Sequence, residues 1–178
     1  MYKISKIEHS PGVIIGIDPG KKGGLAVLDG DKIIRLSKTP VGDIKARKAY
    51  HTIVQGYDVT GMVALLKGFE NRYPVVVIER VHAMPGQGVT SMFTFGQGYG
   101  LWLGVCTALN IPIVLVEPRE WKEKLLEKEE RKFKKFSCEK AKELFPDIDL
   151  KQGRMINDHD GMAEAILISV YGGMQLWQ

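Results

Sequence analysis

The order of strand-like and helix-like segments limits what this 178-residue chain can fold into. Short runs rich in β-branched residues occur at 13–18, 74–79 and 111–118, and helix-like stretches separate the later runs. Asp29-Gly30-Asp31 lies between two further apolar runs and is a strong hairpin signal. The pattern predicts one α/β domain over residues 1–178, with a mixed five-stranded sheet: three antiparallel strands, then two parallel ones, flanked by helices.

The remaining segments give the expected element boundaries. Residues 39–58 have no clear period and are interpreted as a surface loop or a short helix. Asp158 is suited to cap the last helix, and Gly172-Gly173 is suited to stop it. The expected helices cover about 58–70, 92–109, 118–128 and 131–145 and the stretch after Asp158.

Composition limits the setting. Hydrophobic residues make up 44% and charged residues 26%, which is typical of a soluble globular protein. Cys106 and Cys138 form neither a disulfide framework nor a zinc site. No apolar run reaches the roughly 18 residues of a membrane span, and residues 1–13 do not resemble a signal peptide. We therefore expect a reduced, cytoplasmic setting and no membrane partner.

Acidic residues stand where strands end. Asp18 and Glu79 each close a β-branched run, and ligand sites in such sheets form at the carboxyl ends of the strands. If the two strands are neighbours, the two carboxylates converge. A third acidic cluster, residues 157–160, opens the last helix, where Asn157 and Asp160 are spaced to face the same way.

Carboxylates at one place repel each other unless a cation neutralises them, and oxygen ligands favour Mg²⁺ or Mn²⁺. Two such ions form a clamp for attack of water on a phosphodiester. Each residue also has a plain structural interpretation. Asp18 is then a turn residue, Glu79 a surface residue, and Asp160 a favourable charge in the first turn of a helix. Without a metal site, all of these separate interpretations would have to hold at once in one fold, so the metal site is favoured.

Four motifs occur in a set order: "IGIDPGKKGG", "VVVIERV", "VEPREWK" and "DHDGMAEAILI". In that order and at about those distances they resemble the RuvC family of Holliday-junction resolvases, within the RNase H-like superfamily. The segment "MPGQGVTSMFTFGQGYG" resembles its counterpart in phage-borne RuvC-like proteins. The resemblance extends over residues 13–171.

The resemblance implies a homodimeric endonuclease that resolves four-way DNA junctions with paired nicks, leaving 5′-phosphates. It implies two Mg²⁺ per active site, with Mn²⁺ as a substitute, in the cytoplasm of a bacterium or a phage-infected host. The metal-ligand roles fall on Asp18, Glu79 and Asp160. Asn157 stands where the family has Asp or His, so the fourth position is open among residues 157–159: Asn157, Asp158 and His159. Glu164, one helical turn after Asp160, is a candidate supporting ligand.

Two aromatic residues are candidates for DNA contact. In RuvC-like proteins an aromatic side chain of this region wedges into the junction, and Phe93 and Phe95 lie in it. They are two residues apart on a helix, so at most one can be the wedge, and both have an alternative as core or interface residues. Gly96, Gly98, Gly100 and Gly104 suit close helix approach in a dimer or packing on the sheet.

Residues 119–142 hold ten Lys and Arg against six Glu, an excess equal to the net charge of +4 of the whole chain. Such a run suits contacts with the DNA backbone, or is simply a solvated helix face. Lys21, Lys22, Lys45, Arg47 and Lys48 are weaker candidates. The DNA-contact candidates here are Lys122, Arg131, Lys132, Lys134 and Lys135.

Three other functions compete with junction resolution. Actin-like and sugar-kinase ATPases share the core and a similar first loop, but they need two such domains. A non-catalytic junction-binding protein on the same fold would suit Asn157 at the fourth position. A nuclease that cuts flaps, forks or RNA–DNA hybrids would use the same acidic residues.

Overall fold

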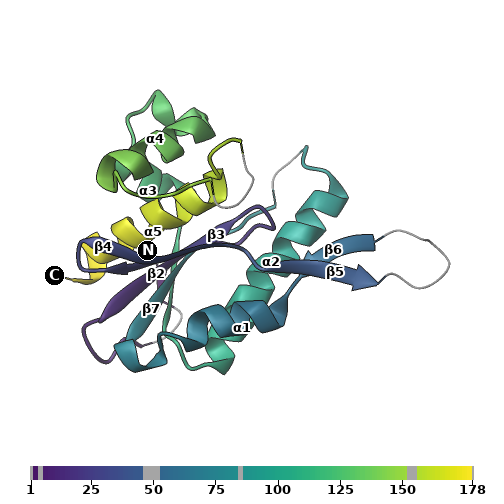
Figure 1. The fold of residues 1–178 in the computed structure, drawn as a ribbon, viewed down its shortest axis with the longest axis horizontal. Helices are drawn as coiled ribbons and strands as arrows, with labels where there is room; N and C mark the ends of the chain where they lie inside the picture. The colour runs from purple at the N-terminus through teal and green to yellow at the C-terminus, as the bar shows by residue number, and fades with distance from the viewer. Residues whose placement is uncertain (1, 4–5, 46–52, 84–85, 152–155, 178) are drawn as a thin grey trace.

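The main sheet of the protein has six strands in the order β1-β8-β7-β2-β3-β4 (Figure 1). The computed structural model describes residues 2–3, 6–45, 53–83, 86–151 and 156–177. β2, β3 and β4 pair antiparallel, whereas β7 pairs parallel with β2, and β8 with β7. The strands are β1 (Tyr2–Lys3), β2 (Val13–Asp18), β3 (Gly24–Asp29), β4 (Lys32–Lys38), β7 (Pro74–Glu79) and β8 (Ile113–Val116).

The five expected strands and their directions are confirmed. The sixth, β1, was not expected, and its two residues pair antiparallel with β8 at the edge of the sheet. So short a strand leaves no alternation in the sequence from which it could be predicted.

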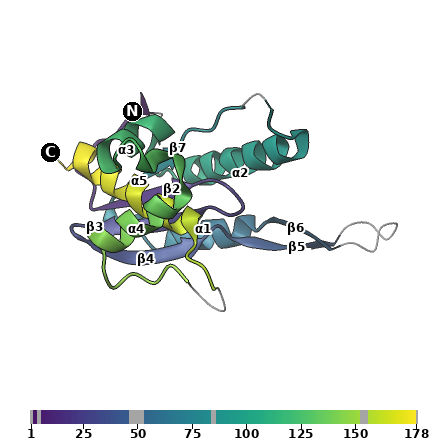
Figure 2. The same cartoon turned by 90° about the horizontal axis from the view of Figure 1, so that it is seen from above.

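The prediction of a loop or short helix before residue 58 is wrong. Residues in this part form β5 (Val41–Lys45) and β6 (Ile53–Tyr57), an antiparallel pair in its own small sheet. Figures 1 and 2 show that the pair extends away from the main sheet, on the side where α2 also projects. Each strand carries a glycine, Gly42 or Gly56, which weakens the alternating signal. Arg47 and Lys48 lie outside the described residues.

Helices cover both faces of the sheet. Figure 1 shows α1 and α2 on one face and α3, α4 and α5 on the other. Within the described part of the chain, no helix combines the length and apolar character needed to cross a membrane. The helices are α1 (Val59–Lys67), α2 (Val89–Ala108), α3 (Pro118–Leu125), α4 (Lys134–Leu144) and α5 (Asp160–Leu176).

The expected helices are confirmed, with three corrections at their ends. α4 begins at Lys134 rather than near 131, because Glu130–Lys132 form a separate 3₁₀ turn. The N-cap of α5 is His159, whose ring accepts a hydrogen bond from the Met162 N–H, and not Asp158. α5 also continues through Gly172-Gly173 to Leu176. A Cβ on Gly172 would lie 2.7 Å from Val77, so this glycine serves close packing on the sheet.

Side chains alternate between the two faces along the central strands. Ile15 and Ile17 of β2 pack in the core beneath α1 and α2, whereas Ile14 packs in the core beneath α3 and α5. Val77 of β7 also belongs to the second core. Continuing the alternation to the last residue of each strand turns Asp18 and Glu79 toward the α5 face.

Candidate active site

Three carboxylates meet where β2 and β7 end. The parallel register pairs Ile17 with Ile78, so the residues that follow, Asp18 and Glu79, stand side by side. Asp18 is 8% exposed, and Glu164 of α5, which lies over these strands, is 6% exposed. The prediction that Asp18 and Glu79 converge is therefore confirmed, and α5 contributes Glu164 as a third acid.

The pKa values show how unfavourable this gathering is for ionised carboxylates. Burial, and then the charges of Glu164 and Glu79, raise the pKa of Asp18 to about 8, although a backbone N–H of Gly20 and Lys134 oppose the shift. Burial and the charge of Glu164 likewise raise the pKa of Glu79. A cation in the groove would lower both pKa values and favour the ionised forms of Asp18 and Glu79.

Trp121 of α3 holds Glu79 in place. Its indole N–H donates to Glu79 Oε1 at 2.9 Å, and its side chain is completely buried. This hydrogen bond and Lys122 both act against the rise in the pKa of Glu79. Lys122 itself lies over the Trp121 ring at 4.9 Å, with its Nζ 3.5 Å from Glu164 Oε1. Trp121 and Lys122 thus connect two of the three acids.

Asp160, at the start of α5, is paired with a lysine. Lys134 Nζ donates to Asp160 Oδ2 at 2.5 Å. Burial would raise the pKa of Asp160, but the hydrogen bond and charge of Lys134 outweigh it and hold the pKa below its ordinary value. Burial lowers the pKa of Lys134, whereas Asp160, Glu164 and Asp18 raise it, with a net rise. Asp160 is therefore an ionised carboxylate neutralised from within the chain.

The three residues before Asp160 have separate surroundings. Asp158 Oδ2 accepts from Lys142 Nζ at 2.6 Å, and its Oδ1 is buried with no hydrogen-bond partner among the described residues. Burial lowers the pKa of His159, in keeping with the neutral ring that caps α5. Asn157 is exposed and lies, with Asp158 and Asp160, along a cavity of about 400 Å³ beside α4.

A backbone contact ties the turn after β2 to the first turn of α5. Gly23 and Gly161 form a parallel bridge. A Cβ on Gly161 would lie 2.1 Å from the carbonyl oxygen of Lys22, and one on Gly24 would lie 2.8 Å from Met162 Cα. The Gly23-Gly24 pair therefore admits α5 beside Asp18.

The donor set of the site is chemically suited to a hard divalent cation, because every nearby acid offers oxygen. Asp18 is also buried, and the charge of Lys134 does not offset the rise in its pKa. Within the described ranges, however, no group of three or more His, Cys, Asp or Glu side chains is arranged so that it could hold a metal ion. In this arrangement Lys134 is paired with Asp160, and Lys122 with Glu164.

The acids form the floor of a groove of about 920 Å³. Its walls come from the turn after β2, the ends of β6 and β7, and parts of α2, α3 and α4. Seven basic side chains line it, against three carboxylates. Basic walls around an acidic floor suit a phosphate-containing ligand. The basic residues are Lys21, Lys22, Arg80, Lys122, Arg131, Lys132 and Lys134.

The structure separates the predicted DNA-contact residues. Phe95 lines the groove, whereas Phe93 is 74% exposed and lies outside it. Arg131 lines the groove too, but its guanidinium donates to the carbonyl oxygens of Leu126 and Glu123 and so braces the end of α3.

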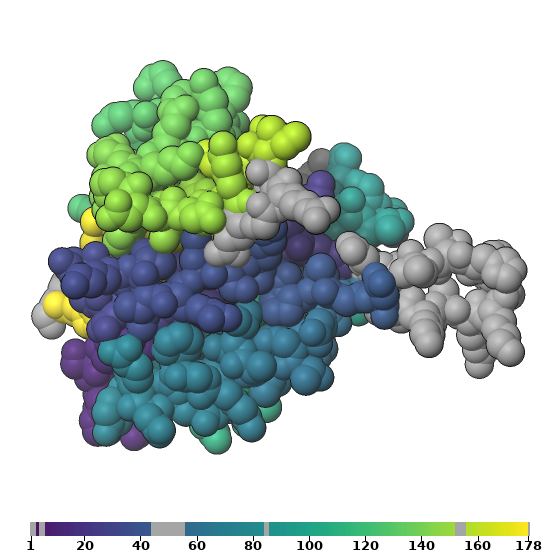
Figure 3. All heavy atoms as spheres, in the orientation of Figure 1, coloured from purple at the N-terminus to yellow at the C-terminus, as the bar shows by residue number. Residues whose placement is uncertain are grey.

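Lysines of the basic run have different surroundings. Lys122, Lys132 and Lys134 line the groove, while Lys135 lies over the Phe136 ring at 4.6 Å, beside the smaller cavity. The basic run is thus divided between the groove and the cavity beside α4. In Figure 3 the green segment that contains α4 stands as a lobe above the blue strands.

Sequence reasoning did not single out Trp121 or the pair of Arg80 and His82. Arg80 donates to Glu117 Oε1 at 2.9 Å, and a ring nitrogen of His82 lies 3.0 Å from Glu117 Oε2. Trp121 lies in the motif "VEPREWK", where a tryptophan among charged residues signals a buried face of a helix but not a hydrogen bond to an acid of another strand.

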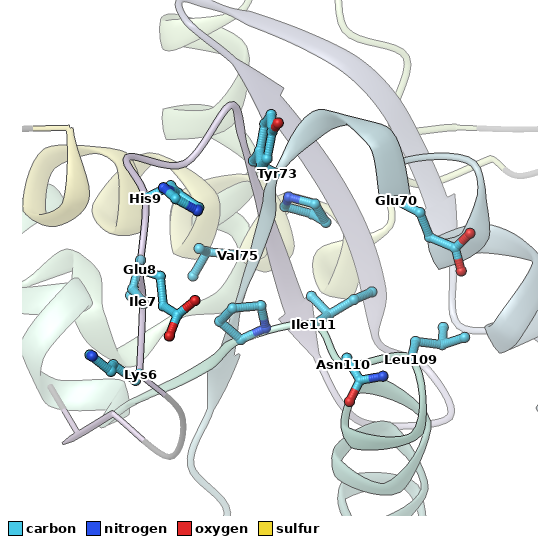
Figure 4. A pocket seen from close by; sticks show the side chains of 12 residues that line it. Lys6, Ile7, Glu8, His9, Glu70, Tyr73, Val75, Leu109, Asn110 and Ile111 are labelled. Carbon is cyan, nitrogen blue, oxygen red and sulfur yellow. The ribbon is translucent and has the colours of Figure 1, made fainter.

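A further cavity of about 300 Å³, separate from the groove and from the cavity beside α4, lies at the opposite, amino ends of β7 and β8 (Figure 4). The rings of His9 and Tyr73 meet edge-to-face there, with centroids 5.9 Å apart. Ile111 and Val75 contribute apolar walls. No acid of the groove lines this cavity.

The comparison with solved structures agrees with this fold. No protein-family model matches the sequence, and no curated protein matches it. Among solved structures, Thermus thermophilus RuvC in complex with a Holliday junction substrate is similar, with a TM-score of 0.55 and 18% identity. The similarity covers 92% of this chain and 93% of that one.

Two further solved structures are more distant. A second Thermus thermophilus RuvC structure is 17% identical over 92% of this chain and 97% of that one, with a TM-score of 0.49. The yeast mitochondrial Holliday junction resolvase Ydc2 is 17% identical over 94% of this chain and 79% of that one, with a TM-score of 0.45.

The mixed sheet with helices on both faces is an RNase H-like α/β fold. Within that class, the chain has the fold of Thermus thermophilus RuvC. At this level of identity the likeness establishes the fold, and the activity must be argued from the site.

Proposed function

We propose that the protein is a structure-selective endonuclease that resolves four-way DNA junctions by metal-assisted hydrolysis, leaving 5′-phosphates. The observation that carries this proposal is the set of three carboxylates on the floor of a groove with basic walls: Asp18 and Glu164, which are buried, and Glu79, which is half-buried. The basic walls suit a nucleic-acid backbone, and the floor suits the cation that phosphodiester hydrolysis uses. The proposal carries the expectation of a cytoplasmic location.

Asp18, Glu79 and Asp160 would hold two Mg²⁺ ions, or Mn²⁺ in their place, with Glu164 as a further oxygen donor. Such ions, when bound, activate a water molecule and stabilise the leaving 3′-oxygen. Asp160 would then have to exchange Lys134 for the metal. Asn157 remains the candidate for the fourth position, because Asp158 is bonded to Lys142 and His159 caps α5.

Other residues of the chain would position these groups. Trp121 would fix the Glu79 carboxylate through its indole N–H. Lys134, freed from Asp160, would turn its charge toward a DNA phosphate at the wall of the groove. Lys132 would add a phosphate contact without reading base sequence.

Paired nicks in a symmetric junction call for two active sites, so we propose a homodimer formed through α2. Val89 and Phe93 are 79% and 74% exposed on this helix. Gly96, Gly100 and Gly104 follow at four-residue spacing, and a Cβ on any of them would meet nothing within 4 Å. Of the four glycines noted in the sequence, Gly98 instead packs inward, where a Cβ would lie 2.2 Å from the Tyr57 hydroxyl.

The dimer is tested by a size change at an open glycine. Gly100→Leu should convert the dimer to a monomer in sedimentation equilibrium, because a bulky side chain holds two helices apart. Ala64→Leu, at an exposed position of α1, is the matched control and should leave the mass unchanged. A wild-type protein that sediments as a monomer at every concentration would contradict this part of the proposal.

The activity is tested with labelled four-way junction, flap and duplex DNA of matched sequence, with Mg²⁺, with Mn²⁺ or with EDTA. We expect paired nicks in the junction that disappear with EDTA and in Asp18→Asn, while junction binding persists. Equal cutting of flaps would indicate a less selective nuclease of the same fold. Binding without cutting in either metal would indicate a junction-binding protein and overturn the proposal.

A further inference from the structure

Phe133 is an exposed aromatic residue on the wall of the groove that holds the acids. Its side chain is 58% exposed, and it lines the groove between Lys132 and Lys134. The Phe133 ring meets that of Phe136 at 64°, with centroids 6.2 Å apart. The ring is thus supported by a half-buried neighbour, while more than half of the side chain remains in contact with solvent.

Neither helix capping nor core packing explains a phenylalanine here. Phe133 occupies the N-cap position of α4, with φ −124° and ψ 123°, and makes no capping hydrogen bond. Ser, Thr, Asp or Asn at this position would stabilise the helix by about 1 kcal/mol relative to a residue that cannot cap. Phe133 also contributes to none of the core clusters among the described residues. A residue that breaks a local rule in this way is expected at a functional site.

Charges beside the ring favour a nucleic-acid ligand over a protein partner. Lys132 is exposed and forms no ion pair with any described residue. Basic residues outnumber acids along the groove, as noted above. Cations that follow a phosphate backbone, together with an aromatic ring on which bases stack, characterise surfaces that bind unpaired nucleotides.

The other aromatic residues of the groove are less available. The Tyr57 hydroxyl donates to the Thr94 carbonyl oxygen at 3.0 Å, and Tyr57 is buried. Phe95 is half-buried, and its ring lies 3.3 Å from where a Cβ on Gly20 would be. Among the Phe and Tyr side chains that the structure describes along the groove, Phe133 is therefore the exposed one. The ring of His82 is exposed too, but one of its nitrogens lies 3.0 Å from Glu117 Oε2.

We propose that Phe133 stacks on an unpaired base of the DNA strand that enters the groove, so that the protein prefers DNA with exposed base faces to intact duplex. This inference rests on the proposed action on branched DNA. Base faces are covered in duplex DNA and exposed at branch points, gaps and single strands. Stacking tolerates any base, so Phe133 would contribute to selectivity for structure and not for sequence.

The test measures binding in the Asp18→Asn background, which separates affinity from cleavage. Dissociation constants are determined by fluorescence anisotropy for a four-way junction, a duplex with a short single-stranded gap, and the intact duplex, at one salt concentration. Phe133→Ala should weaken binding to the gapped duplex and the junction about tenfold, while the intact duplex changes less than about twofold. The parent protein should quench the fluorescence of 2-aminopurine placed in the gap, and the Phe133→Ala variant should no longer do so.

Substitutions at the same position separate stacking from simple apolar contact. Phe133→Trp should retain the affinity, whereas Phe133→Leu should behave like Phe133→Ala, because leucine has no aromatic face. Lys132→Ala should weaken binding to all three DNAs about equally and reduce the salt dependence. Tyr73→Ala is the matched control, because Tyr73 is 67% exposed in the distant cavity and its loss should change none of the affinities.

The outcomes distinguish this inference from the proposed function. An unchanged affinity of Phe133→Ala for gapped DNA and the junction, with the wild-type protein still cutting junctions, overturns the role of Phe133 alone. The same result with a changed oligomeric state assigns Phe133 to a protein interface and also overturns it. Full affinity of Phe133→Leu for gapped DNA and the junction excludes stacking. Failure of the parent protein to bind any branched or gapped DNA overturns both proposals.

Discussion

The two ends of the parallel strands carry cavities of opposite character. At the carboxyl ends, Asp18 and Glu79 are removed from water with their pKa values raised. At the amino ends, the charged residues Lys6 and Glu8 remain exposed around a smaller, partly apolar cavity (Figure 4). A fold tolerates buried acids where a ligand supplies the compensating charge, and this is the reason for proposing the functional site at the unfavourable end.

Asp18→Asn should have the largest effect on this contrast. Nicking of junction DNA should fall at least about a hundredfold, since even residues that only support metal ligands account for 10 to 100-fold. The same variant should unfold at a higher denaturant concentration at pH 8 without metal, because a neutral amide replaces a buried carboxylate. A less stable variant would show that Asp18 is not destabilising in the wild type.

The pH dependence of stability provides the second test. Native Asp18 keeps its proton up to about pH 8, whereas the unfolded chain releases it near its ordinary pKa of 3.8. The unfolded state therefore binds fewer protons in this window. The free energy of unfolding of the metal-free protein should fall as the pH rises through it, by at most about 1.4 kcal/mol per pH unit. Denaturant titrations should show a smaller slope in Asp18→Asn, and Mg²⁺ should restore stability most strongly near pH 8.

Trp121→Phe removes the hydrogen bond to Glu79 and keeps an aromatic ring. We expect a roughly tenfold slower nicking rate, as for other partners of metal ligands. The midpoint of activity against Mg²⁺ concentration should rise, because Glu79 is less well positioned. The free energy of unfolding should change by only about 1 kcal/mol. A large loss of stability with an unchanged Mg²⁺ midpoint would assign Trp121 to packing alone.

His9→Ala should have the smallest effect. It removes one ring of the edge-to-face pair at the amino ends of the strands. Junction nicking and its Mg²⁺ dependence should remain within about twofold of the wild type, because no charge of the groove changes. A loss of nicking comparable to that of Trp121→Phe would mean that the two ends of the sheet are not independent.

The main sheet could be predicted because its signals are local. β-branched runs and the Asp29-Gly30-Asp31 turn directly encode β2, β3, β4 and β7. The β5–β6 pair could not be predicted in this way. Each of its strands is short and contains a glycine, and its register pairs residues that are not neighbours in the sequence. The positions of Asp18 and Glu79 at two strand ends were predictable for the same reason as the strands themselves.

The rest of the site depends on tertiary contacts that no spacing encodes. Asp158 and His159 are both able to cap α5, and Lys142 of α4 decides between them by bonding Asp158. Glu164 and Asp160 are one turn apart, and only the docking of α5 shows which one lies with Asp18. Phe133 looked like part of a basic helix, and its exposure on the groove wall depends on where α4 begins.

The glycine bridge between the turn after β2 and α5 bears on how the protein is made. α5 follows every strand of the sheet in the chain, and domains generally fold from the N-terminal side during synthesis. A nascent chain that has formed the sheet still lacks Asp160 and Glu164 until α5 docks at Gly23. On the ribosome, the chain would therefore acquire its ability to cut DNA in one late step, and partly synthesised copies would be harmless to the DNA around them.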